Sequence, residues 1–244
     1  MSETPACELL PMPPSGRRFE SERTVRLGDV DPDGELRLDA VARYLQDIAS
    51  DDALDATLPN ALGWVVRRTM IRVDRPAAIG ERVRLKTFCT GAGRSWAERR
   101  TSLAGEHGAA IEAVSLWVQV DIGTGRPTRL GHHFHEIYGE SAGGRVVSSK
   151  LSLANRPPEH VARQSWMFRR SDLDQFGHVN NAAHWAAIEE VLQRGGVRRR
   201  GVGEMEYLAA ADADDPGELM THHDMTWLVA HGRTLTAARW SPLD

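Results

Sequence analysis

Hydrophobic and polar positions alternate in several short stretches of the chain. In residues 81–88, Val83 and Leu85 alternate with charged side chains, and residues 115–122 follow the same pattern. A period of two residues predicts strands with one buried face. Similar patterning and composition predict further strands at 19–27, 64–73, 95–103, 165–170, 204–208, 218–230 and 233–240.

Helical spacing occurs in two places. In the first block of the chain, four apolar residues recur every three or four positions, which predicts a helix with one buried face: Leu38, Val41, Leu45 and Ile48. Residues 181–193 are apolar almost all round and are followed by the pair Gly195-Gly196. We therefore expect a second helix that ends at these glycines and is covered on most of its sides.

Segments rich in proline, glycine and serine divide the chain. Residues 1–18 are expected to form a loose N-terminal leader, and residues 141–161 a linker. The two patterned blocks are therefore residues 19–140 and residues 162–244. We interpret these blocks as two domains.

The second block repeats the first. Residues 29–36 align without gaps on residues 172–179, so that Asp31 corresponds to Asp174, 143 residues later, and Glu35 corresponds to His178. In both blocks this segment lies between a predicted strand and a predicted helix, and antiparallel strands follow. We predict an α+β fold of two units, each a curved antiparallel sheet around one central helix, whose sheets pair.

Composition narrows the class of protein. The chain has 244 residues, a formal net charge of −4 and two cysteines. No apolar run approaches the ~20 residues of a membrane helix, and the first residues lack the basic and apolar regions of a secretory signal. Two cysteines make no disulfide framework, and the charge gives no sign of nucleic-acid binding. We predict a cytoplasmic protein with neither a nucleic-acid nor a membrane partner.

Candidate chemistry is concentrated just before the second helix. Asp174, His178, Asn180 and Asn181 lie within eight positions of one another. A helix start offers free N–H groups and positive potential, which would polarise a thioester carbonyl. Asp174 could orient or deprotonate a water molecule or attack directly, and His178 could bind the substrate or tune the acid. Asn180 or Asn181 could equally be only a helix cap.

The segment Asp-Leu-Asp-x-x-Gly-His-Val-Asn-Asn at residues 172–181 resembles the catalytic segment of acyl-ACP thioesterases and of the wider 4-hydroxybenzoyl-CoA thioesterase group. The first block resembles the substrate-binding half of the same enzymes at residues 37–47, 63–68, 94–100 and 117–121.

This resemblance implies a tandem double-hotdog fold and a role in lipid metabolism, with hydrolysis of fatty acyl-ACP to a free fatty acid and the carrier thiol. It implies that Asp174 is the catalytic aspartate and His178 the active-site histidine, with Asn180 and Asn181 at the helix start. Block one would supply most of the acyl pocket and block two the chemistry. No cofactor is implied, and the partner is an acyl carrier protein or CoA thioester.

The chain departs from the plant enzymes of this family at two places. Phe176 stands where those enzymes have Asn, and Leu208 to Ala211 stand where they have a Glu-Cys pair. A cysteine nucleophile is therefore not supported. An acyl-CoA thioesterase and a non-catalytic acyl-binding hotdog protein remain alternatives, as do a monomer and a homodimer.

Two further motifs suggest metal binding, but we predict no metal site. Residues 29–34 resemble the start of an EF-hand loop, but Ala40 stands at the twelfth position, where a bidentate Glu belongs. The histidines of residues 132–135 are expected on a loop without further ligands.

A basic run follows the second helix at residues 198–200. These arginines could contact an anionic carrier or a CoA phosphate, or they could simply form a solvated basic loop.

Overall fold

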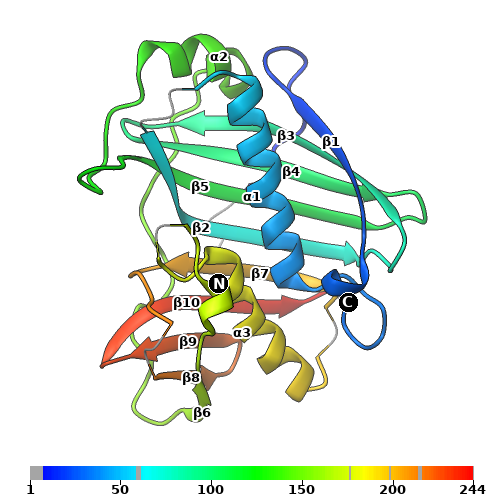
Figure 1. Ribbon diagram of the computed structural model, residues 1–244, viewed down its shortest axis with the longest axis vertical. Helices are drawn as coiled ribbons and strands as arrows, with labels where there is room; N and C mark the ends of the chain where they lie inside the picture. Colours follow the sequence, from blue (N-terminus) through cyan, green and yellow to red (C-terminus); the bar gives the residue numbers. More distant parts are fainter. Residues whose placement is uncertain (1–7, 59–61, 176, 198, 214–215, 244) are drawn as a thin grey trace.

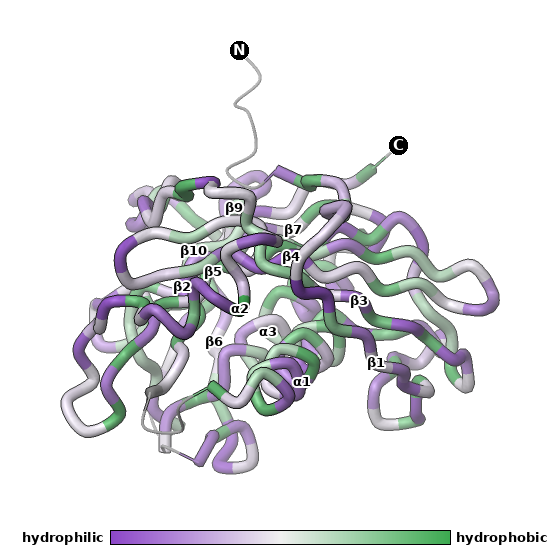
Figure 2. The backbone as a smooth tube through the Cα atoms, turned by 90° about the horizontal axis from the view of Figure 1, so that it is seen from above, coloured by the Kyte–Doolittle hydropathy of each residue, from purple (hydrophilic) through white to green (hydrophobic). Residues whose placement is uncertain are grey.

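The computed structural model describes residues 8–58, 62–175, 177–197, 199–213 and 216–243. In this part of the chain, one antiparallel sheet of ten strands curves around two long helices, α1 and α3, which lie side by side on its concave face (Figures 1 and 2). The molecule therefore has a sheet layer and a helix layer.

Each half of the chain contributes five neighbouring strands. The first half supplies β1 (Phe19–Thr24), β2 (Leu62–Arg75), β3 (Arg82–Ala92), β4 (Trp96–Gly105) and β5 (Ala110–Asp121). The second supplies β6 (Ala162–Trp166), β7 (Gly201–Tyr207), β8 (Gly217–His222), β9 (Met225–Ala230) and β10 (Arg233–Pro242). The order across the sheet is β1-β3-β4-β5-β2-β7-β10-β9-β8-β6, so the second half repeats the first in mirror order.

The helices bury the faces that the sequence predicts. They are α1 (Leu38–Asp55), α2 (His132–Ala142) and α3 (Asn181–Arg194), with short 3₁₀ turns at Leu27–Asp29 and Arg170–Asp172. The predicted apolar stripe of α1 is buried, and α3 adds Trp185, which has no exposed surface, to the same core. None of the helices in the described ranges is long and apolar enough to cross a membrane.

The repeat extends to individual backbone hydrogen bonds. The N–H of Asp31 donates to the carbonyl of Glu35 (3.0 Å), and the N–H of Asp174 donates to the carbonyl of His178 (2.8 Å). In both loops the residue after the turn also donates its N–H to a carbonyl farther along the same unit. Leu36 donates to Ala77 (2.8 Å), and Val179 donates to Ala211 (3.0 Å). The predicted fold of two curved antiparallel units with paired sheets is confirmed.

Two local predictions were wrong. Residues 218–230 form the hairpin β8–β9 and not one strand, because the chain reverses at His223, whose φ of 54° lies in the left-handed region. The histidines of residues 132–135 begin α2 and do not form a loop. Phe134 and Tyr138 on this helix are buried against the C-terminal end of α1 and β3, which is the apolar periodicity that the prediction overlooked.

The segment between the two halves covers the face of the sheet opposite α1 and α3. The buried carboxylate of Glu206 accepts the N–H groups of Ser152 (2.6 Å) and Leu153 (3.1 Å). The indole of Trp227 donates to the carbonyl of Ala154 (2.6 Å) and packs with Leu153. Backbone groups of this segment therefore pair with the polar side chains of that face.

Close packing between α3 and β7 requires glycine at residue 203. A Cβ atom at Gly203 would lie 2.8 Å from the ring of Trp240 and 2.9 Å from that of Trp185. We expect Gly203→Ala to lower the free energy of unfolding by about 1–3 kcal/mol, as overpacking does. The matched control is Gly139→Ala on α2, where nothing beyond the helix's own backbone lies within 4 Å of the added Cβ and the change should be neutral or stabilising. Equal melting temperatures for the two variants would contradict this account of the interface.

Candidate active site at the start of helix α3

The start of α3 is held by hydrogen bonds from the residue before the helix and from strand β7. Asn180 is the N-cap, and its Oδ1 accepts the N–H of Ala182 at 2.8 Å. The hydroxyl of Tyr207 donates to the carbonyl of Asn181 (3.2 Å) and accepts the indole N–H of Trp185 (3.0 Å). Of the two asparagines, Asn180 is therefore the side-chain cap, and the position of Asn181 is set by β7.

The loop before α3 brings Asp174 and His178 into contact with each other. The carboxylate of Asp174 accepts the backbone N–H of His178 at 3.2 Å. Asp174 is half-buried, whereas the imidazole of His178 is exposed. Phe176, at the position where the plant enzymes have Asn, lies outside the described residues.

Two hollows adjoin the first turn of α3. An open groove of about 540 Å³ lies among the start of α1, residues 166–173 and one face of α3. A much smaller cavity of about 10 Å³ lies between α1, β2, β5 and the start of α3. Ala182 lines both, so the helix start separates the two. The groove is of the size that small-molecule sites have, and the small cavity has room for about one water-sized group.

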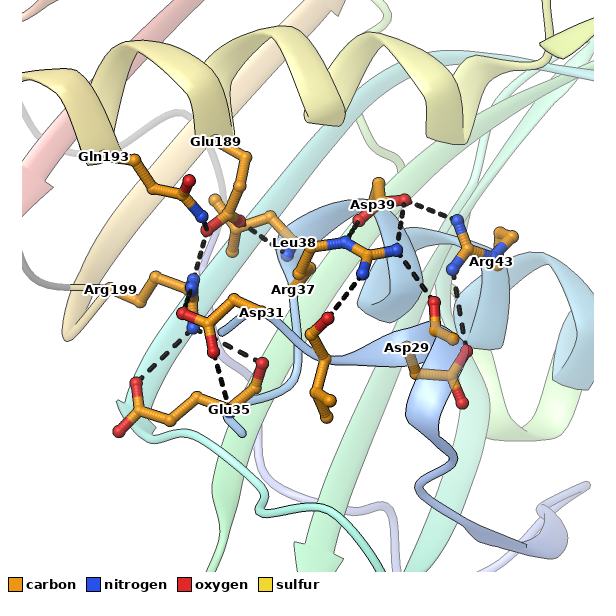
Figure 3. Close-up of polar contacts among 12 residues, drawn as sticks. Asp29, Asp31, Glu35, Arg37, Leu38, Asp39, Arg43, Glu189, Gln193 and Arg199 are labelled. Carbon is orange, nitrogen blue, oxygen red and sulfur yellow. Dashed lines mark hydrogen bonds and ion pairs between the residues drawn. The ribbon is translucent and has the colours of Figure 1, made fainter. Parts of the chain in front are cut away.

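The corresponding loop of the first half is closed by ion pairs (Figure 3). Arg199 contacts the carboxylates of Asp31 and Glu189 directly and that of Glu35 at 3.4 Å. The other oxygen of Glu189 accepts the N–H of Leu38, the first residue of α1, at 2.9 Å. The side chains of Asp31, Glu189 and Arg199 are only 5–6% exposed.

Charge complementarity keeps this cluster ionised. Burial works against the charged form of Asp31, but Arg199 and the N–H groups of Glu35 and Asp33 outweigh it and lower the pKa of the carboxyl. Burial likewise acts to lower the pKa of Arg199, and the carboxylates of Glu189 and Asp31 more than reverse this effect. Asp31 is thus held in an ion pair and is not available as a second catalytic acid.

For the basic run at residues 198–200, both predicted roles, contact with an anionic carrier and a solvated loop, were wrong for Arg199. The side chain neither meets a carrier at the surface nor lies in a solvated loop, because two buried carboxylates draw it between the halves. Arg200 is exposed, and Arg198 lies outside the described residues. The spacing of charges within one segment gives no information about partners 168 residues away.

The motifs that suggested metal binding have other contacts. His132 and His133 lie 3.2 Å and 3.7 Å from the carboxylate of Glu136 on the exposed side of α2. Asp31 of the EF-hand-like segment binds Arg199 and turn N–H groups. Among the described residues, no group of three or more His, Cys, Asp or Glu side chains is placed to hold a metal ion.

Family models match both halves of the chain. The model of the acyl-ACP thioesterase N-terminal domain matches residues 16–138, and that of the C-terminal domain matches residues 155–222. The chain belongs to the acyl-ACP thioesterase family. It is a thioester hydrolase, and its activity is the hydrolysis of fatty acyl-ACP.

Solved structures share the fold of this thioesterase over nearly its whole length. The 12:0-ACP thioesterase from Umbellularia californica has a TM-score of 0.73 at 20% identity and covers 93% of this chain and 98% of its own. An acyl-ACP thioesterase from Bacteroides thetaiotaomicron has a TM-score of 0.69 at 18% identity and covers 92% and 97%. At these identities the likeness concerns the fold alone, which is the predicted tandem double hotdog.

A relative in Mycobacterium tuberculosis (strain ATCC 25618 / H37Rv) is more similar in sequence. This uncharacterized protein is 29% identical over 185 residues, which are 75% of this chain and 74% of the relative.

The thioesterase has a buried histidine that the sequence analysis missed. His184 on α3 lies between Phe168 and Tyr207, with ring centroids 4.8 Å and 5.7 Å away. Burial lowers its pKa to about 3, so the imidazole is neutral at physiological pH. Its Nδ1 has no hydrogen-bond partner among the described residues. The available signal was a polar residue among the apolar residues of this helix.

The ion cluster around Arg199 joins the two halves, and its removal should destabilise the enzyme. Arg199→Met leaves the carboxylates of Asp31 and Glu189 buried without their cation. We expect the free energy of unfolding to fall by about 3–5 kcal/mol, the usual effect of breaking a buried ion pair. Urea denaturation measures this effect, and Arg200→Met, at an exposed position, is the control.

Removing the carboxylates as well provides a further check on this cluster. The triple variant Arg199→Met, Asp31→Asn, Glu189→Gln leaves no unpaired carboxylate in the cluster. Its free energy of unfolding should therefore be higher than that of Arg199→Met. If Arg199→Met were as stable as Arg200→Met, the cluster would have no structural role.

Proposed function

We propose that this thioesterase hydrolyses its substrate at the start of α3, with Asp174, His178, Asn180 and Asn181 as the active-site residues. One observation carries the proposal: the two halves have the same loop and helix start, but Glu189 and Arg199 occupy the start of α1. In the described part of the chain, no acceptor binds the N–H of Asn181, whereas Glu189 binds the corresponding N–H of Leu38.

The chemistry follows from these positions. The thioester carbonyl oxygen accepts the N–H of Asn181 at the positive end of the helix, which polarises the carbon. Asp174 takes a proton from a water molecule as its oxygen attacks that carbon. The tetrahedral intermediate collapses, the C–S bond breaks, and the thiolate of the carrier takes up the proton that Asp174 removed from water. Asn180 holds the helix start in place, and the exposed His178 binds the substrate as it arrives.

The two halves have different roles in this proposal. Residues 19–140 form the acyl-binding domain and residues 162–244 the catalytic domain, with residues 1–18 as leader and residues 141–161 as linker. Support comes from the small cavity, where Leu45, Val66 and Trp117 of the first half face the start of α3. An acyl chain that enters there has to widen the space between α1 and the sheet, because the cavity holds only about one water-sized group.

How strongly the enzyme prefers acyl-ACP to acyl-CoA is the first experimental question. We expect steady-state hydrolysis of a panel of acyl-ACP and acyl-CoA substrates of varied chain length to show a higher kcat/KM for acyl-ACP at every length. The arginines along the open groove support an anionic carrier arm there, although each is already paired with a carboxylate in the described structure: Arg37, Arg43 and Arg169. A preference for acyl-CoA would reassign the carrier, and no turnover of either class would refute the site.

The assignment of Asp174 is tested by comparing the two copies of the loop. Asp174→Asn keeps the shape of the side chain but removes the base, so kcat should fall by roughly 10²-fold or more. Asp31→Asn should leave kcat nearly intact but lower the melting temperature, because Arg199 loses a buried partner. His178→Ala should reduce activity mainly through substrate positioning.

Melting temperatures separate loss of chemistry from loss of structure in these variants. A folded Asp174→Asn protein with the parent rate would refute the proposed chemistry. Loss of activity in Asp31→Asn alone would mean that the catalytic half has been misidentified.

A further inference from the structure

The two halves differ at a position that the proposed reaction leaves unassigned. Glu189 on α3 lies 143 residues after Gln46 on α1, and the same offset relates Leu38 to Asn181 at the two helix starts. Gln46 is the ninth residue of its helix, as Glu189 is of its own. The two side chains therefore occupy corresponding places in the repeat.

Three groups from both halves converge on one point beside the start of α1. Glu189 accepts the N–H of Leu38 with one oxygen and binds Arg199 with the other. The same guanidinium binds Asp31. The guanidinium of Arg199 thus fills the space between the loop carboxylate, the helix start and the residue of the facing helix.

The corresponding groups beside the start of α3 are Asp174, the N–H of Asn181 and the side chain of Gln46. Gln46 and Asn181 line the same small cavity of about 10 Å³. Gln46 is half-buried, and in the described part of the chain neither its amide nor the N–H of Asn181 makes a hydrogen bond. Two residues that carry unpaired donors therefore line a space of about the size of one oxygen-bearing group.

We propose that Gln46 is a catalytic residue whose side-chain amide donates, beside the N–H of Asn181, to the thioester carbonyl oxygen. This inference rests on the proposed function of the α3 start. When water attacks, the carbonyl π electrons move onto that oxygen, and both hydrogen bonds strengthen as its charge grows. When the intermediate collapses and the C–S bond breaks, the electron pair leaves with sulfur and both donors keep their protons.

The difference between an amide and a carboxylate explains why only one copy can act in this way. A carboxylate at this position accepts the helix N–H and repels an oxygen that gains negative charge, as the contact from Glu189 to Leu38 illustrates. The glutamine amide offers two N–H donors and no net charge. The Gln46 position therefore distinguishes an open site from an occupied one.

Three variants of Gln46 test the proposal in the full-length enzyme with an acyl-ACP or acyl-CoA substrate that it turns over. Gln46→Leu removes the donor and should lower kcat by roughly 10²-fold, the usual effect of losing one such hydrogen bond, with KM and melting temperature nearly unchanged. Gln46→Glu should lose more activity, because its carboxylate takes the N–H of Asn181, while its stability is kept or raised. Gln46→Asn, one methylene shorter, should fall between the parent enzyme and Gln46→Leu.

A glutamine elsewhere provides the matched control. Gln164 is also half-buried but lies on the edge strand β6, and Gln164→Leu should leave kcat and KM unchanged. A structural cap would give the opposite pattern, in which Gln46→Glu keeps the parent kcat and Gln46→Leu loses melting temperature without a specific loss of kcat. That pattern would overturn the role of Gln46.

Different results would refute the proposed function and this inference. If Asp174→Asn is inactive while Gln46→Leu turns over at the parent rate, the inference is wrong and the site stands. If the parent enzyme turns over no acyl thioester, the site itself is wrong, and the role of Gln46 falls with it.

Discussion

The arrangement of the molecule depends on the antiparallel pairing of β2 with β7. This pairing runs from Arg68 opposite Glu206 to Val73 opposite Gly201 and joins two five-stranded units into one sheet. Because both units keep their helix on the same face, α1 and α3 must lie side by side and share one apolar core. The flank of each helix is thereby brought to the start of the other, where the loops that precede the helices also lie. A site at this place takes residues from both halves.

The two halves use the same backbone for different purposes. Both loops carry the same backbone hydrogen bonds, so the difference between them lies in the side chains. At the start of α1, Arg199 pairs with both Asp31 and Glu189 away from water, and Glu189 occupies the helix start. A buried carboxylate without a cation would be costly, so the arginine is needed for this loop to be closed. At the start of α3, the uncharged Gln46 lines the same small cavity as Asn181, and in the described part of the chain the N–H of Asn181 has no acceptor.

The same junction also holds the start of α3 in position. Tyr207, on the strand that pairs with β2, links the carbonyl of Asn181 to the indole of Trp185. Trp185 in turn packs on Gly203 of β7, where only a glycine leaves room for its ring. A donor that is already held in position need not reorganise when charge develops, which is the condition for efficient electrostatic stabilisation. The neutral His184, one turn inside the helix, adds no charge that could compete.

The sequence by itself determined the elements, their repetition and the segment to which we assign the chemistry. Period-two and helical patterns gave most strands, α1 and α3, and the alignment of Asp31 with Asp174 gave the two-unit fold. These features are local or repeat at a fixed offset, so one chain is enough to read them. The sequence analysis missed the hairpin at His223 because a turn with a positive φ leaves a weak local pattern. It missed the helix α2 because a short, partly exposed helix has a weak apolar period.

Only the tertiary structure decided which copy of the loop is closed. The cation that binds Asp31 comes from 168 residues away, and the carboxylate that caps α1 comes from 151 residues away. The pairing of β2 with β7 places α1 beside α3, so residues that no local pattern connects meet at one helix start. Gln46 likewise could be assigned a role only from the structure, which places it beside Asn181. The partners of a side chain are set by packing between elements and not by its neighbours in the chain.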